Sequence, residues 1–165
     1  MAAERNEHLV VIMLKPVPLG QEFEIWEPHI TIVPWFPCDN EDGLDKVLAT
    51  VASRHKTLSV KAGKVEEWGR KEKYPVQIID SDWRLLSLHM DVFNSLEKNG
   101  FPIHQKDFMG EKYLPHIALR NRLQKGRELP QGKEIQIGKF TLVRQRRLKD
   151  SSRMIKSLVR DYELG

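Results

Sequence analysis

The sequence predicts an α+β protein of about seven strands and two helices. Short β-branched apolar runs bounded by Gly and Pro predict the strands, and two segments with helical spacing predict the helices. The chain has 165 residues, of which 40% are hydrophobic and 30% are charged, as is usual for a globular protein. We therefore expect a single domain over residues 1–165.

Two apolar runs near the N-terminus predict strands. His8–Lys15 is rich in β-branched residues and is stopped by Pro16 and Pro18. His29–Phe36 has a similar composition, and Pro34 inside it predicts an edge strand or an early end. The connection between the two strands is short.

Two later segments predict amphipathic helices. Glu41–His55 has apolar residues three and four apart and acidic residues in its first turn, which suits the helix dipole. Trp83–Lys98 has the clearer apolar stripe, with Ser81-Asp82 as its cap and Asn99-Gly100 as its stop. The other strands are predicted at Thr57–Glu66, Tyr74–Asp80, Tyr113–Arg120, Glu134–Gln145 and Arg153–Leu164. Gln124–Gly132 is predicted to be one surface loop, which could close over a ligand.

Basic residues are concentrated in the last quarter of the chain. Residues 1–119 contain 14 basic and 18 acidic side chains, whereas residues 120–160 contain 13 and 3, a local charge of +10. Lys and Arg gain free energy near phosphates by releasing counterions, so this segment favours a nucleotide or RNA ligand. A solvated surface is the alternative interpretation.

Composition gives no sign of a membrane or secreted protein. The apolar run Leu9–Leu14 is far shorter than the ~20 residues that span a bilayer, and the first residues lack a signal-peptide pattern. The single cysteine, Cys38, excludes an intrachain disulfide and a cysteine-cluster zinc site. We expect a cytoplasmic monomer that does not bind membranes.

A Pro-His-Ile tripeptide occurs twice, each time at or near the start of a predicted strand. Its histidines are His29 and His116, followed two residues later by Thr31 and Ala118. Since side chains alternate along a strand, each histidine shares a face with the residue two positions on. The repeat predicts a pseudo-twofold arrangement in which the two histidines meet.

With these motifs 87 residues apart, the sequence resembles the two-histidine (2H) phosphoesterase superfamily, which includes 2′-5′ RNA ligase and cyclic phosphodiesterase proteins. The resemblance covers nearly the whole chain. It implies a bilobal α+β fold with two antiparallel sheets lining a central cleft and helices outside. It also implies hydrolysis, without metal or cofactor, of a 2′,3′-cyclic phosphate or related ribose phosphodiester of RNA or a nucleotide. In reverse, the same site would join RNA ends through a 2′-5′ link.

Imidazole chemistry fits this reaction. One group must take a proton from water and another must give a proton to the leaving ribose oxygen, and an imidazole pKa of about 6.5 suits both tasks. We expect His29 and His116 to be the acid and the base, in an order that the sequence leaves open. The hydroxyl of Thr31 is expected to donate a hydrogen bond to the phosphate.

The sequence departs from the family pattern in two places. Ala118 stands where a threonine or serine is expected, and the loss of one such donor can raise the barrier by about 3 kcal/mol. Arg120, two residues on, is the expected replacement, and Arg122 is a further candidate. The connection Pro16–Pro28 is short where many members insert a helix, so we expect a trimmed first lobe.

Three alternatives stay open at this point. The chain could be a catalytically weakened nucleotide- or RNA-binding module of the same fold, marked by Ala118, or an enzyme for a small cyclic nucleotide alone. A metal site is disfavoured because no His-x-His or His-x-x-x-His spacing occurs and no carboxylate lies beside His116 on its strand.

Aromatic residues and other histidines supply the remaining candidates. Five aromatic residues flank the motifs and could stack on a base or belong to the core: Trp26, Trp35, Phe36, Phe108 and Tyr113. Of the other histidines, His104 is close enough in sequence to His116 to reach the cleft. His8, His55 and His89 are expected to be structural.

Overall fold

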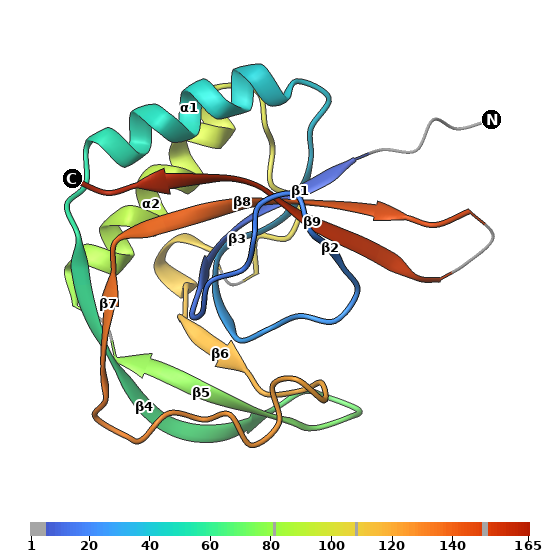
Figure 1. Cartoon of the computed structure of the whole chain (residues 1–165). Coiled ribbons are helices and arrows are strands. Elements are labelled where there is room, and N and C mark those ends of the chain that lie inside the picture. Colours follow the sequence, from blue (N-terminus) through green and yellow to red (C-terminus); the bar gives the residue numbers. More distant parts are fainter. Residues whose placement is uncertain (1–5, 81, 108, 150–151) are drawn as a thin grey trace.

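The computed structural model describes residues 6–80, 82–107, 109–149 and 152–165, and consists of one curved sheet with two helices packed on one face (Figure 1). The strands are β1 (Glu7–Met13), β2 (Glu22–Phe23), β3 (His29–Pro37), β4 (Leu58–Trp68), β5 (Tyr74–Asp80), β6 (His116–Ala118), β7 (Glu134–Ile137), β8 (Lys139–Arg147) and β9 (Met154–Glu163). The helices are α1 (Glu41–Ser53) and α2 (Trp83–Lys98), with a 3₁₀ turn at Gly110–Lys112. Ser81, which is part of the predicted cap of α2, and Phe108, which is a predicted aromatic partner, lie outside the described residues.

All neighbouring strands pair antiparallel, in the order β2-β9-β8-β1-β3-β6-β5-β4-β7. We call β2, β9, β8, β1 and β3 the first half-sheet, and β6, β5, β4 and β7 the second half-sheet. A single residue pair, Ile30 with Ile117, joins the two halves. The α+β class is confirmed, but the expectation of two separate sheets is wrong, because this pairing makes the sheet continuous.

Most predicted elements are present, and the differences have local causes. The predicted strand at residues 134–145 is divided at Gly138 into β7 and β8, and the one at residues 113–120 keeps only three residues as β6. Pro34 neither ends β3 nor makes it an edge strand. It falls at a register shift between β1 and β3 and beyond the pairing with β6, so no paired position of the ladder falls on it. The short connection before β3 carries β2 and no helix, as expected.

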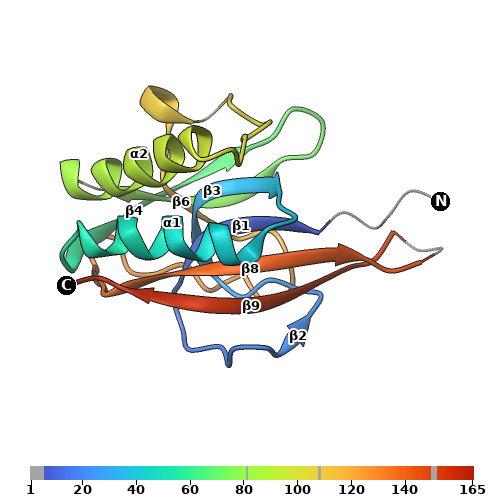
Figure 2. The ribbon, with the colours of Figure 1, turned by 90° about the horizontal axis from the view of Figure 1, so that it is seen from above.

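A side-chain cap fixes the first turn of each helix. The side chain of Asn40 accepts from the backbone N–H of Gly43 at the start of α1, and Asp82 accepts from that of Arg84 at the start of α2. The helices lie side by side, as seen from above in Figure 2. Among the described residues, no helix is both long and apolar enough to cross a membrane.

The sheet buries apolar residues on both of its faces. Alternate residues of β1 point in opposite directions: Val10 belongs to the main core beneath the helices, whereas Val11 belongs to a smaller cluster on the other face. We call this smaller group the cleft-side cluster, and the face of the sheet on which it lies, away from the helices, the cleft face or cleft side. Its buried members are Leu9, Val11, Val143 and Leu158, with Met13, Val17, Phe23, Trp26 and Trp35 partly buried around them. The first half-sheet therefore has an apolar floor on the face away from the helices.

Candidate active site

The two Pro-His-Ile motifs lie side by side at the junction of the half-sheets. Ile30 and Ile117 pair directly and are buried in the main core, so the flanking histidines, His29 and His116, face away from the helices. Continuing the antiparallel register by one residue places Thr31 opposite His116. Both imidazoles are half-buried on one face of the sheet, as the repeat predicts.

Backbone carbonyls orient both imidazoles in the same way. The Nδ1–H of His29 donates to the carbonyl oxygen of Glu27 at 2.8 Å, and that of His116 donates to Leu114 at 2.9 Å. A carbonyl can only accept, so it selects the tautomer with the proton on Nδ1 and a lone pair on Nε2. Within the described part of the chain, neither Nε2 has a hydrogen-bond partner. Each is therefore available to exchange a proton with a ligand.

A tryptophan packs against each of these histidines. The ring centroids of Trp26 and His29 are 4.1 Å apart, and those of Trp68 and His116 are 4.5 Å apart. Trp26 lies beside the first motif in sequence. Trp68 comes from the end of β4, 48 residues before His116, and the sequence reasoning missed it because only strand pairing brings it to the site.

Burial lowers the pKa of both imidazoles. The pKa of His29 is lowered to about 4, mainly by burial and also by the charges of Lys156 and of His116 when it is protonated, while the bond to Glu27 opposes the shift. Burial also lowers the pKa of His116, opposed by its bond to Leu114. Both side chains are therefore neutral at neutral pH in the free protein.

Lys156 is a second residue that the sequence reasoning missed. It belongs to the basic C-terminal run, but nothing in its spacing distinguishes it from the other cations. Its Nζ donates to the carbonyl oxygen of Glu24 at 2.6 Å and lies 5.9 Å from the ring centroid of Trp26. Pairing with β2 and the shared strand face with Leu158 place it on the cleft side, near His29. Burial lowers the pKa of its ammonium group.

The predicted phosphate partners occupy different parts of the cleft face. Thr31 and His116 together line a pocket of about 400 Å³. Arg120 lies above Tyr74, with its guanidinium carbon 5.0 Å from the ring centroid and 63% of its side chain exposed. Arg122 is exposed and lines a separate pocket beside β2. Phosphate binding by Thr31, Arg120 and Arg122 stays a prediction.

The predicted aromatic partners divide into core and cleft residues. Tyr113 is buried, and its hydroxyl donates to the carbonyl oxygen of Thr31 at 2.8 Å, so it braces β3. Phe36 is in the main core, and Trp35 packs near Trp26 in the cleft-side cluster. His104 is exposed, and among the described residues it has no hydrogen bond or ring contact with the two motif histidines.

Three other histidines are held in the framework, as expected. Each has a ring nitrogen bonded to a carboxylate or a carbonyl oxygen: His8 to Glu41 at 2.6 Å, His55 to Asp91 at 2.7 Å, and His89 to Ile32 at 2.8 Å. Within the described ranges, no group of three or more His, Cys, Asp or Glu side chains is arranged to hold a metal ion.

Acidic residues elsewhere in the chain compensate much of the basic C-terminal run. Among the described residues, six of its cations form ion pairs: Arg120 with Glu72, Lys139 with Asp161, Arg144 with Glu41, Arg146 with Glu22, Arg153 with Glu24, and Arg160 with Asp45. The local excess of +10 along the sequence is thus largely balanced in space. An RNA path along β8 and β9 would have to compete with these pairs.

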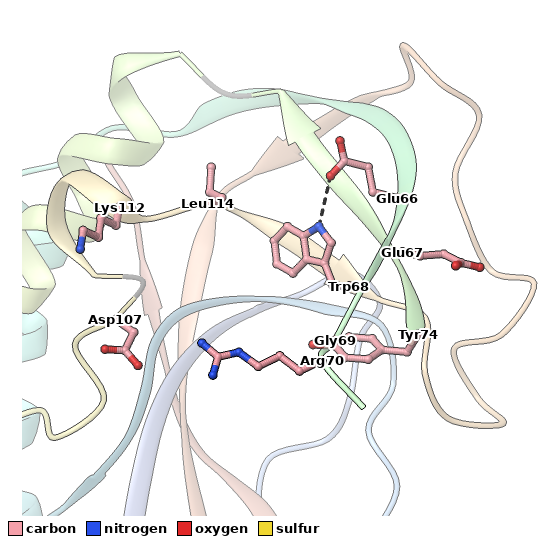
Figure 3. Close-up of a pocket in the computed structure, with 9 residues that line it drawn as sticks. All are labelled: Glu66, Glu67, Trp68, Gly69, Arg70, Tyr74, Asp107, Lys112 and Leu114. Carbon is pink, nitrogen blue, oxygen red and sulfur yellow. Dashed lines mark hydrogen bonds between the residues drawn. The ribbon is translucent and has the colours of Figure 1, made fainter. Parts of the chain in front are cut away.

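A second pocket, of about 900 Å³, lies beside Trp68 (Figure 3), the ring of which packs against His116. Its walls are the β4–β5 hairpin and the segment before β6, and Trp68 connects it to the histidine. The residues lining it are Glu66, Glu67, Trp68, Gly69, Arg70, Tyr74, Asp107, Lys112 and Leu114.

The structure of the chain is similar to known structures, although its sequence has no close match. No family model and no curated protein sequence matches the chain. Its structure is similar to a crystal structure of a phosphoesterase, with a TM-score of 0.62 and 14% identity, covering 98% of this chain and 99% of that one. A protein of Thermus thermophilus has a TM-score of 0.69 at 14% identity, covering 96% of this chain and 97% of that one.

Escherichia coli LigT in complex with 3′-AMP has a TM-score of 0.62 at 15% identity, covering 98% of this chain and 99% of LigT. The chain has the LigT fold. The structural resemblance expected from two tripeptides thus extends over nearly the full length. LigT has also been crystallised with ATP, NADP⁺ and phosphate.

Proposed function

We propose that this chain is a metal-independent phosphoesterase that hydrolyses a 2′,3′-cyclic phosphate or related ribose phosphodiester of RNA or nucleotides. The observation that carries the proposal is the pair of imidazoles on β3 and β6, each fixed through Nδ1 to a backbone carbonyl and each with a free Nε2. Residues 1–165 act as one domain. Attack by a ribose 5′-hydroxyl in place of water would run the reaction as a 2′-5′ ligase.

We assign the base role to His29, because its pKa of about 4 keeps the imidazole unprotonated from mildly acidic pH upwards. Its neutral Nε2 takes a proton from water as the water oxygen forms a bond to phosphorus. His116, protonated on Nε2, gives that proton to the ribose oxygen as the P–O bond of the ring breaks. The product is a phosphate monoester, and exchange with solvent returns both imidazoles to their starting states.

We expect two groups on the cleft face to bind the phosphate. The hydroxyl of Thr31 lies beside His116, and the ammonium group of Lys156 lies on the side of His29. By the register of β3 and β6, Ala118 lies opposite His29, so Lys156 supplies positive charge where the second motif lacks a hydroxyl. Arg120 is a further candidate from the second half-sheet.

Hydrolysis in EDTA tests this function directly. The purified chain is expected to convert an oligoribonucleotide ending in a 2′,3′-cyclic phosphate into one ending in a monoester, measured by anion-exchange chromatography. Release of phosphate by a 3′-specific phosphatase then identifies the product isomer. Binding without turnover would contradict the proposal and favour a nucleotide-binding module, which is the second candidate because of Ala118.

The pH profile of kcat/KM is expected to be bell-shaped with an acidic optimum. The base form of His29 exists above its pKa of about 4, and the acid form of His116 exists below a pKa that burial holds under 6.5. The rate should therefore be greatest between these values and fall about tenfold per pH unit at higher pH. Measurements from pH 3.5 to 8.5 at constant ionic strength check this, and a plateau extending above about pH 8 would contradict it.

A further inference from the structure

Two cations in the second pocket have no ion-pair partner among the residues that the structure describes. Arg70 extends from the β4–β5 hairpin across the pocket, towards the segment that carries Asp107 (Figure 3). Lys112 lines the same pocket from the 3₁₀ turn before β6. They contrast with the cations of β8 and β9, many of which are paired. Arg70 and Lys112 are therefore available to an anionic ligand.

The pocket also has an aromatic surface. The indole N–H of Trp68 donates to Glu66 at 3.1 Å (Figure 3). This bond fixes the ring that packs on His116. Tyr74, paired with Trp68 across the hairpin, lines the pocket as well. Aromatic rings beside cations are the combination on which single-stranded nucleic acids bind, because bases stack on the rings and phosphates bind the cations.

This pocket adjoins the one that contains the histidine. The pocket of about 400 Å³ lined by Thr31 and His116 shares Asp107 and Leu114 with the pocket of about 900 Å³. Leu114 is 52% exposed and stands two residues before His116. A chain whose phosphate lies at the two histidines can therefore continue past Leu114 into the second pocket.

We propose that the pocket of Arg70, Lys112, Trp68 and Tyr74 binds the nucleotide next to the reacting phosphate of an RNA strand. The base stacks on the aromatic side chains, and the phosphate on its 5′ side binds the two cations. The substrate is then an RNA end of at least two nucleotides rather than a mononucleoside cyclic phosphate. This inference rests on the proposed function for the reacting end, but binding in the pocket can be measured without turnover.

A variant that lacks the two pocket cations and a matched control test the inference. The test variant carries Arg70→Ala and Lys112→Ala. The control carries Lys46→Ala and Lys98→Ala, which remove the same charge from exposed positions on α1 and α2, on the other face of the sheet. We would measure kcat/KM for a dinucleotide and for a mononucleoside, each ending in a 2′,3′-cyclic phosphate. The loss caused by the test variant is expected to be about tenfold greater on the dinucleotide than on the mononucleoside, and the control should show no such difference.

A binding assay separates this inference from the proposed function. A fluorescein-labelled tetraribonucleotide ending in a 3′-phosphate has no cyclic ester to open, and its Kd is read by anisotropy. The test variant should weaken binding about tenfold relative to the control and reduce the slope of log K against log salt by about 0.7 or more. Equal Kd values for the two variants, or no binding by the wild type, would overturn the inference. If the tetranucleotide binds as expected but neither substrate is turned over, the proposed function alone fails.

Discussion

Replacement of either His29 or His116 by alanine is expected to lower kcat for cyclic phosphate hydrolysis by about 10²–10⁴-fold, because each supplies one of the two proton transfers. The two residues are expected to act as a unit, so the double variant should be little slower than either single variant. Initial rates in EDTA measure this, and the Kd of a 3′-phosphate-ended oligonucleotide should change far less than kcat.

His55→Gln is the matched control for these variants. His55 follows the end of α1, and its side chain is hydrogen-bonded to Asp91 of α2. It therefore lies on the helix side of the molecule, away from both motifs. Its replacement should leave kcat within about twofold of the wild-type value, because glutamine can keep a hydrogen bond to Asp91 and the position is remote from both motif histidines. A His116→Ala variant that keeps more than a tenth of wild-type turnover would show that His116 is not the acid.

Replacement of Lys156 by methionine is expected to lower kcat by about 10²-fold, the cost of removing one preorganised charge from a developing oxyanion. Methionine keeps most of the apolar stem over Trp26 and removes only the ammonium group. The change should also raise the pKa of His29, because the charge of Lys156 lowers it in the wild type. NMR titration of the His29 imidazole measures that shift independently of activity.

Lys133→Met serves as the control for the loss of charge. Lys133 is exposed in the turn before β7, in the second half-sheet. It should alter neither kcat nor the titration of His29. A Lys156→Met variant with lowered kcat but an unchanged pKa at His29 would show that Lys156 has a structural role and does not act on the reacting groups.

Local patterns were sufficient for the parts of the fold that depend on neighbours in sequence. The apolar stripe of α2 and the strand β5 have the predicted bounds, and the tripeptide repeat predicted which face each histidine shares. These features follow from side-chain period and capping. The continuity of the sheet could not be predicted, since it depends on one residue pair, Ile30 with Ile117, and no local signal specifies such a pair.

The rest of the candidate site depends on contacts between distant segments. Trp68 reaches His116 only because β4 pairs with β5 and β5 pairs with β6. Lys156 reaches His29 only because β9 pairs with β2. The net charge of the basic run also depends on residues that are distant in sequence. Its charge was counted correctly along the chain, but the acids that neutralise it, such as Glu22 and Glu41, lie more than 100 residues away.

The strand order also sets when the site can assemble during synthesis. β1 lies between β3 and β8, and β9 covers the outer side of β8, so the first half-sheet needs strands from both ends of this sequence. The hairpin of β4 and β5 is close in sequence to β6 and can form while the ribosome is still translating. A nascent chain therefore carries both histidines for some time before it can use them, and it gains the cation beside His29 only when β9 emerges.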